Sequence, residues 1–139
     1  MAKPTGSSFE VRVGCDVQSV YDIRAAIDSA GDRYLHRVLG HGERAEAARL
    51  ATPGLLERYV SGRFAGKEAV YKALRVRPDI ALGWSQIEII ADETGAPRVC
   101  LTGAAAELSA AAGIDDIAIS ISHSGSFALA VATAIAAPA

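Results

Sequence analysis

The stretch RFAGKEAVYKAL, residues 63–74, concentrates charged side chains in a segment that has the pattern of a helix. Glu68 and Lys72 are four residues apart, so they would lie on one face of that helix, one turn apart. Such a pair stabilises a helix by only about 0.2–0.5 kcal/mol, and the spacing alone favours an ordinary surface ion pair. The functional alternative is that Lys72 and Glu68 face one cleft, where Lys72 neutralises a phosphate and Arg63 and Lys67 line the approach.

A second acid that could act with Glu68 is Asp16, in the stretch FEVRVGCDVQ. This stretch alternates apolar and polar residues, which predicts a half-buried strand with Asp16 on the side away from the apolar face. Two carboxylates, completed by substrate phosphates and water, are a usual way for proteins to hold Mg²⁺. The commoner outcome for two acids so far apart in a sequence is a pair of solvated surface side chains. We expect the apolar face of the strand to comprise Phe9, Val11, Val13, Cys15 and Val17.

The third candidate is the motif SHSGS, which we interpret as a turn between two apolar strands. Ser122, His123 and Ser124, with the open backbone near Gly125, could surround a phosphate. Serine and glycine are also common in turns for purely local reasons. A serine-hydrolase triad is a poor alternative, because the motif is not a nucleophile elbow and no acid is obviously paired with the histidine.

The order of predicted elements favours an α+β fold with a mainly antiparallel sheet packed on helices. Gly62 and Gly66 lie inside the predicted central helix, where each costs about 1 kcal/mol relative to alanine. We therefore expect another part of the chain to pass close to them, or the helix to break near Gly62. We expect strands at 9–18, 86–91, 97–102, 117–122 and 127–135; helices at 20–30, 52–74 and 103–112; and short helical pieces over 32–50, broken at Gly40 and Gly42.

Size and composition set the class of protein. The 139 residues, half of them hydrophobic, fit one domain, 1–139, with ends 1–8 and 136–139 frayed. The net charge of −2 gives no basis for general nucleic-acid binding, and no apolar run approaches the roughly 20 residues that cross a membrane. The two cysteines have no framework or metal spacing and are interpreted as small core residues. With no signal peptide before the first polar residues, we expect a reduced, cytoplasmic protein.

Three stretches in this order, VGCDV, GRFAGKEAVYKAL and ISISHSGSFALAVA, resemble the phosphopantetheinyl transferases, specifically the short holo-acyl-carrier-protein synthase class. The resemblance covers nearly the whole chain. Its most specific part runs from Phe64 to Ala69, with Lys72 one turn on, because the family pattern is an aromatic residue, two small residues, Lys-Glu-Ala and a later lysine. It implies the phosphopantetheinyl transferase fold.

The resemblance also implies a reaction. Asp16 and Glu68 would ligate Mg²⁺, and the metal would bridge to the diphosphate of coenzyme A. A serine of an apo-acyl carrier protein would attack the phosphorus next to the pantetheine arm and release adenosine 3′,5′-bisphosphate, as in fatty acid or polyketide biosynthesis. Glu68, or water held by the metal, would take the serine proton, and Lys72 would stabilise the leaving phosphate. The residues implied to bind coenzyme A are Arg63, Lys67, Tyr71, Pro97 (against the adenine), Ser122, His123 and Ser124.

Short members of this family are homotrimers with active sites between subunits, so the resemblance implies a homotrimer in which His123 serves the neighbour's Asp16 and Glu68. One segment and one single residue depart from the family pattern. Residues 75–78, Arg-Val-Arg-Pro, replace a glycine-rich phosphate turn, and Asp22 replaces an arginine that docks the acidic carrier protein. Docking would then fall to Arg24, Arg33 and Arg37.

Two other functions remain open from the sequence. One is a non-catalytic subunit that binds coenzyme A or a nucleotide and has kept the fold, which the altered residues 75–78 would favour. The other is a metal-dependent phosphohydrolase, because the same two acids could activate water. Release of adenosine bisphosphate without a carrier protein would distinguish the hydrolase.

Overall fold

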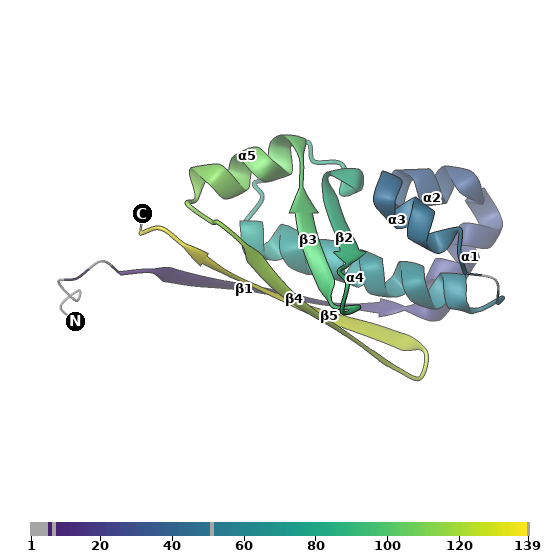
Figure 1. Cartoon of the computed structure of the whole chain (residues 1–139). Coiled ribbons are helices and arrows are strands. Elements are labelled where there is room, and N and C mark those ends of the chain that lie inside the picture. Colours follow the sequence, from purple (N-terminus) through teal and green to yellow (C-terminus); the bar gives the residue numbers. More distant parts are fainter. Residues whose placement is uncertain (1–5, 7, 51, 139) are drawn as a thin grey trace.

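A long helix, α4, lies across one face of a three-stranded antiparallel sheet in the computed structural model (Figure 1). The structure describes residue 6, residues 8–50 and residues 52–138. The strand order is β1-β5-β4, and a separate hairpin pairs β2 with β3. This arrangement confirms the predicted α+β class with antiparallel pairing. The bounds are β1 (Glu10–Ser19), α1 (Val20–Ala30), α2 (Asp32–Val38), α3 (His41–Ala47), α4 (Leu55–Leu74), the 3₁₀ turn η1 (Trp84–Gln86), β2 (Ile87–Ala91), β3 (Pro97–Leu101), α5 (Gly103–Ala111), β4 (Ile117–Ser124) and β5 (Phe127–Ala136).

Small residues let α4 approach its neighbours closely. A β-carbon at Gly66 would come within 2.4 Å of the Cδ1 atom of Ile89, and one at Gly62 within 2.9 Å of Nε2 of His123. Ile89 and His123 therefore pass close to the two glycines, as one of the two sequence expectations proposed, and the helix continues through both without a break. The inner face of β5 is equally small, because every second residue from Ala128 to Ala136 is a buried alanine.

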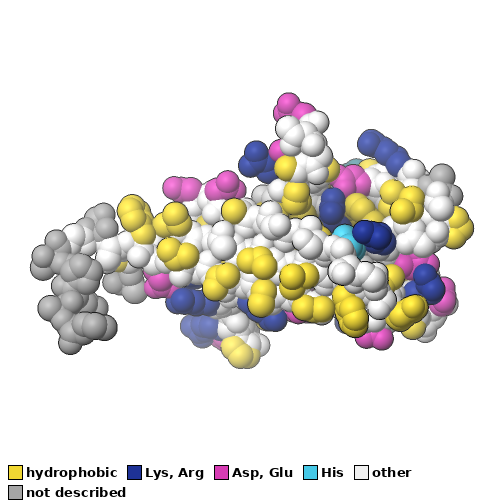
Figure 2. All heavy atoms as spheres, turned by 90° about the horizontal axis from the view of Figure 1, so that it is seen from below, with side chains coloured by type: hydrophobic (Ala, Val, Ile, Leu, Met, Phe, Trp, Pro, Cys, Tyr) yellow, Lys and Arg dark blue, Asp and Glu magenta, His cyan; other side chains and the backbone are white. Residues whose placement is uncertain are grey.

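The apolar face of β1 lies outside, which contradicts the half-buried strand predicted with that face inward. The opposite face of β1, which carries Gly14 and Asp16, packs toward α4. Small side chains fit under the helix, whereas the bulky side chains point away from it. Together with apolar residues of β5, they form what we call the outer face of the sheet, which Figure 2 shows as scattered hydrophobic side chains. Its most exposed members include Phe9 (71%), Val11 (70%), Val13 (65%), Val17 (57%), Phe127 (54%), Leu129 (42%) and Ile135 (58%).

Several predicted boundaries need correction. Helix α4 begins at Leu55 with Gly54 as its N-cap, three residues later than the predicted start at 52. Gly42 lies inside α3, and the break between α2 and α3 falls at Leu39 and Gly40. At the C-terminal end, Ala136 is a buried strand residue, and the Ala137 amide donates to the carbonyl of Ala112, so fraying does not begin at 136. Residues 1–5, 7 and 139 lie outside the described residues.

Two further expectations concerned the cysteines and membrane-spanning segments. Both cysteines are free and exposed, so the interpretation of Cys15 and Cys100 as core residues is wrong. They lie on the outward sides of β1 and β3. Among the described residues no helix has the length and apolar character needed to cross a membrane.

Candidate active site

The structure brings Asp16, Glu68 and Lys72 together where β1 passes under the second half of α4. Lys72 Nζ donates to the Cys15 carbonyl at 2.9 Å and lies 3.4 Å from Asp16 Oδ1. Gln18 Nε2 donates to the other oxygen of Asp16 at 2.6 Å. The side chain of Asp16 is 16% exposed, so it is held by neighbours and still open to a ligand. Two of the three sequence motifs thus meet at one place.

The electrostatics of this group favour a cation between the acids. Burial, followed by the charge of Asp16, raises the pKa of Glu68 above its ordinary value, and Lys72 partly opposes this. The two carboxylates are therefore close enough to repel each other, and a divalent ion would relieve that repulsion. Among the described residues, no three His, Cys, Asp or Glu side chains are placed to hold a metal. Two hard oxygen ligands fit Mg²⁺, which usually keeps several waters and takes phosphate oxygens.

Arg63 lies on another side of α4 and turns toward α3. Its Nη2 atom is 3.3 Å from Glu46 Oε2, and its guanidinium lies 4.5 Å from the centre of the Tyr59 ring. The Tyr59 hydroxyl donates to the same Glu46 oxygen at 2.8 Å. The buried Nε of Arg63 has no hydrogen-bond partner among the described residues. This donor is enclosed, so an anion could use it only after the side chain moved away from Glu46.

Lys67 does not line a cleft. Its side chain is fully buried, and its Nζ lies 2.5 Å from Oε1 of Glu43, whose side chain is equally buried. The expectation that Lys67 lines the approach to a diphosphate is therefore wrong, because a ligand cannot reach an ammonium group that is enclosed and paired. Lysine 67 and Glu68 are neighbours on a helix, so their side chains leave it about 100° apart.

Tyr71 lies on the side of α4 that packs on Trp84, whereas Pro97 belongs to the β2–β3 hairpin. The Tyr71 ring packs on Trp84 with centroids 5.6 Å apart, and Phe64 packs on the same indole at 5.3 Å. Pro97 is the first residue of β3 and pairs with Ala91, directly after the turn that Gly95 makes at φ 86°. Both residues are half-buried.

His123 belongs to β4 rather than to the turn predicted for SHSGS. Its Nε2 lies 3.0 Å from the carbonyl oxygen of Arg58 on α4. Ser122 and Ser124 are exposed on the outer face, since successive side chains of a strand point to opposite sides. The expectation that the three side chains surround one phosphate is therefore wrong within a single chain.

The segment after α4 and the predicted docking arginines are exposed. Arg75 ends α4 at φ 55° and pairs with Glu10, and Arg77 pairs with Asp79 at 2.7 Å. Among the docking candidates, the side chain of Arg24 is 46% exposed and lies 3.5 Å from Glu57. Arg33 and Arg37 are exposed on α2.

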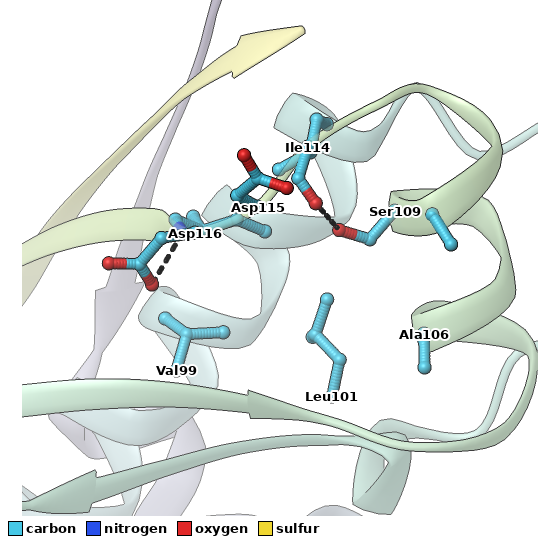
Figure 3. Close-up of a pocket in the computed structure, with 9 residues that line it drawn as sticks. Val99, Leu101, Ala106, Ser109, Ile114, Asp115 and Asp116 are labelled. Carbon is cyan, nitrogen blue, oxygen red and sulfur yellow. Dashed lines mark hydrogen bonds between the residues drawn. The ribbon is translucent and has the colours of Figure 1, made fainter.

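The cavity in Figure 3 lies apart from these residues. It measures about 220 Å³ between α5, β3 and the start of β4, and Val99, Leu101 and Ser109 form part of its wall. The Ser109 hydroxyl is already bound to the Ile114 carbonyl at 3.1 Å. None of the candidate site residues lines this cavity, so the carboxylate pair remains the better candidate for chemistry.

Sequence reasoning missed two participants in this region, Glu43 and Trp84. Glu43 is a fully buried acid on a short, charged helix, and neither its neighbours nor its spacing distinguish it from a surface residue. Trp84 had a weak signal, since a lone tryptophan near the end of a loop usually packs on something. Lys67 also had a usable signal, because it stands among small residues of the buried helix face, Ala65, Gly66 and Ala69.

Comparison with known proteins identifies the family to which this sequence is similar. The model of the 4′-phosphopantetheinyl transferase superfamily matches residues 12–132. The chain is 40% identical over 123 residues to a holo-[acyl-carrier-protein] synthase of Desulforudis audaxviator, which covers 88% of this chain and 91% of that protein. It is 35% identical to the corresponding protein of Edwardsiella ictaluri, over 88% of this chain and 94% of the relative.

Solved structures agree with the sequence comparison. The holo-ACP-synthase of Plasmodium yoelii superposes with a TM-score of 0.78 at 30% identity, over 94% of this chain and 99% of that one. The Helicobacter pylori holo-[acyl-carrier-protein] synthase, solved in complex with coenzyme A, has a TM-score of 0.73 at 28% identity, over 88% and 98% of the two chains.

Proposed function

Because this chain belongs to the 4′-phosphopantetheinyl transferase superfamily, we propose that it is a holo-acyl-carrier-protein synthase. It transfers the 4′-phosphopantetheine arm of coenzyme A to a serine of an apo-acyl carrier protein and releases adenosine 3′,5′-bisphosphate. The observation that carries the proposal is the meeting of Asp16, Glu68 and Lys72 in a chain that matches such synthases over nearly its whole length.

The proposed reaction needs a proton acceptor and a charged group beside the leaving phosphate. The serine oxygen forms a bond to the phosphorus of the pantetheine arm as the bond from that phosphorus to the bridging oxygen breaks. Glu68 takes the serine proton, a role that its raised pKa favours. Lys72, whose ammonium already lies at the carboxylate pair, neutralises the charge that develops on adenosine 3′,5′-bisphosphate.

We assign Mg²⁺ to the pair formed by Asp16 and Glu68. The ion, when bound, neutralises and orients the diphosphate of coenzyme A. Gln18 supports this assignment, because its amide holds one oxygen of Asp16 and so fixes the direction of that carboxylate. The mutual repulsion of the two acids is the second support, since it makes the metal-free group unfavourable.

We assign coenzyme A binding to residues of α4, β4 and the β2–β3 hairpin. Arg63 contributes its unpartnered Nε to a nucleotide phosphate after leaving Glu46. Tyr71 borders the site on the hairpin side, Pro97 lies against the adenine, and His123 contacts a phosphate. Ser122 and Ser124 contribute from the outer face, which requires a second chain to bring the ligand there. Lys67 is left out of this set because it is enclosed.

We further propose that the protein is a homotrimer with its active sites between subunits. The outer face of the sheet supports this, because several large apolar side chains, among them Val11, Val13 and Phe127, are exposed on it, and an exposed apolar patch often marks an interface. The opposite orientation of His123 and the two serines also supports it. A neighbouring subunit that covers the outer face would bring Ser122 and Ser124 to a ligand held by another chain.

The remaining assignments concern the partner and the setting. The apo-carrier docks through exposed arginines, Arg24, Arg33 and Arg37, since carrier proteins of this kind present acidic surfaces. The 139 residues act as one transferase domain in the cytoplasm, which suits two free, exposed thiols.

Intact-mass measurement of apo-carrier proteins tests the function directly. After incubation with the protein, coenzyme A and Mg²⁺, a carrier should gain one phosphopantetheine arm, roughly 340 Da, and a chelator should prevent the gain. The altered residues 75–78 favour the alternative of a non-catalytic coenzyme A-binding subunit. Tight coenzyme A binding with no mass gain on a broad panel of carriers would support that alternative.

A further inference from the structure

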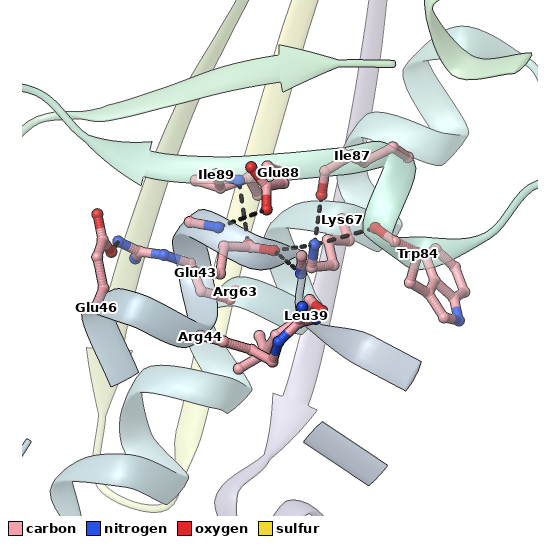
Figure 4. A network of polar contacts seen from close by, with 12 residues as sticks. Leu39, Glu43, Arg44, Glu46, Arg63, Lys67, Trp84, Ile87, Glu88 and Ile89 are labelled. Atoms are coloured by element: carbon pink, nitrogen blue, oxygen red, sulfur yellow. Dashed lines mark hydrogen bonds and ion pairs between the residues drawn. The ribbon is translucent and has the colours of Figure 1, made fainter. Parts of the chain in front are cut away.

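A buried ion pair connects three elements to α4 immediately before Glu68 (Figure 4). Lys67 Nζ donates to Glu43 Oε1 on α3 at 2.5 Å, to the Trp84 carbonyl in η1 at 3.1 Å, and to the Ile87 carbonyl in β2. An ammonium group has three donors, and each has an acceptor here. The side chain is therefore fixed by three separate parts of the chain.

Glu43 is held as firmly as its partner. Its Oε1 also accepts the Gly40 amide at 2.9 Å, and its Oε2 accepts the Ile89 amide at 3.1 Å. Through Glu43 the network ties the start of α3 to strand β2, and through Lys67 it ties both to α4. No oxygen of this carboxylate is left without a donor.

Glu68 follows Lys67 on α4 and lies close enough to Asp16 of β1 to be repelled by its charge. Near the same two residues, a β-carbon at Gly14 would come within 2.0 Å of the carbonyl oxygen of Ala69, so helix and strand touch there. The contact fixes how closely α4 approaches β1, but a contact between small residues does not fix how the helix is turned about its axis. Three hydrogen bonds from Lys67 can fix that rotation.

We infer that the Glu43–Lys67 pair is a positioning device that sets the rotation of α4, so that Glu68 points toward Asp16. The inference rests on the proposed transferase function and extends it to two residues that do not touch substrate. Buried ion pairs are weak contributors to stability, since apolar pairs of the same size often serve as well. A role in geometry therefore explains the pair better than a role in folding.

The test replaces the pair by neutral groups of similar size, in Glu43→Gln/Lys67→Met, within the full chain. The double change leaves no unpaired charge in the interior, whereas Lys67→Met alone would leave the buried Glu43 carboxylate without its partner. Val70→Ala is the matched control, because it removes volume from a buried position of the same helix without touching the network. Carrier transfer, thermal stability, and thermal protection by coenzyme A with Mg²⁺ are measured for each.

We expect kcat of the double variant to fall by roughly 100-fold, the scale of an ångström-sized misplacement, while KM for the apo-carrier stays the same. The Mg²⁺ concentration needed for half-maximal protection should rise. Emission from Trp84, the sole tryptophan, should shift to longer wavelength, because η1 loses its bond to Lys67 and the indole moves away from Phe64 and Tyr71 into water. Val70→Ala should lose stability and keep its kcat. Unchanged kcat in the double variant, or an equal loss in Val70→Ala, would overturn the inference.

A second variant covers the case in which the double variant does not fold. Glu43→Asp keeps the charge and shortens the side chain by one methylene, so the network is pulled without being broken. It should lower kcat and shift Trp84 emission in the same direction by smaller amounts, and unchanged values of both would overturn the inference. If the wild-type protein itself transfers nothing, the proposed function fails; if it is active and the variants match it, only the positioning role fails.

Discussion

Gly14 on β1 lies against the backbone of Ala69 on α4 so closely that a β-carbon there would sit 2.0 Å from the Ala69 carbonyl oxygen. Because that oxygen belongs to a helix backbone, it cannot move aside alone. Gly14→Ala should therefore push α4 away from β1 and lower the free energy of unfolding by about 1–3 kcal/mol. Asp16 and Glu68 flank this contact, so transfer activity should fall as well. Urea unfolding and carrier-transfer rates measure the two effects.

Gly83→Ala is the control for this change. A β-carbon at Gly83 would have its nearest neighbour, the hydroxyl oxygen of Ser85, at 3.9 Å, and the φ of −79° at Gly83 suits alanine. We expect no loss of stability or activity there. Equal behaviour of the two alanine variants would show that the contact at Gly14 does not hold the helix in place.

The raised pKa of Glu68 predicts how stability depends on pH. Burial first, and the charge of Asp16 second, raise this pKa above 4.5, so the folded state binds the proton more tightly than the unfolded chain does. Stability of the metal-free protein should therefore decrease as pH rises through the raised pKa, and stay lower above it. Glu68→Gln removes this effect and should make the metal-free protein more stable near pH 7, with little difference below about pH 4.

Thermal unfolding across pH, with a chelator present, measures this difference. The same variant should have lost carrier transfer, because the proposed proton acceptor is gone. A Glu68→Gln variant that is less stable than wild type near neutral pH would contradict the repulsion between the two acids.

The sequence predicted most helices and strands, but it predicted that the apolar face of β1 is buried, whereas this face is exposed. The spacing of apolar residues identified β1 and the end of α4, because this spacing is a local property that can be read from the sequence. Alternation in β1 did not reveal which face meets the helix. That choice depends on size: Gly14 and the alanines of β5 fit under α4, whereas Val13 and Leu129 do not. An apolar face that another subunit covers, as the proposed trimer requires, is as apolar as a face that packs on a helix. The alternation of residues in β1 therefore could not distinguish the two faces.

The candidate site was predictable only where the motif and the helix period agreed. Glu68 and Lys72 share a face because they are four residues apart, and the structure places both at Asp16. Lys67 looked equally available in the sequence. Its burial depends on Glu43, which comes from a different helix and is brought there by tertiary packing alone. Local patterns carry no information on such a partner.

Arg75 should separate stability from coenzyme A binding. It ends α4 in the left-handed region at φ 55°, where glycine is the usual residue. Arg75→Gly relieves a strain of about 1 kcal/mol, so thermal stability should hold or rise. If its guanidinium replaces a glycine-rich phosphate turn, KM for coenzyme A should rise and KM for the carrier should not. Arg75→Lys keeps the charge and is the control; equal KM values in all three proteins would show that this side chain does not bind coenzyme A.

The outer face of the sheet should control assembly. Val13 on β1 is 65% exposed on this face, where a monomer would tolerate a charge and an oligomer that covers the face would bury it. Val13→Asp should keep its secondary structure, shift to a smaller species in light scattering, and lose transfer activity. Ala111→Asp, on an exposed part of α5, should change neither. A Val13→Asp protein with unchanged mass would exclude this face as the interface.

Shared active sites predict that two inactive variants can restore each other. His123 contacts the first half of α4 through Arg58, whereas Asp16 lies at its second half, and the proposed trimer joins His123 of one chain to Asp16 of the next. His123→Ala and Asp16→Ala should each be inactive. In a mixed trimer, some sites receive an intact histidine and an intact aspartate from different chains. After random exchange of equal amounts, activity should recover toward about one quarter of wild type. Exchange must be shown separately, for example by mass spectrometry of the intact mixed trimers. Proven exchange without recovery would place both residues in sites formed by one chain.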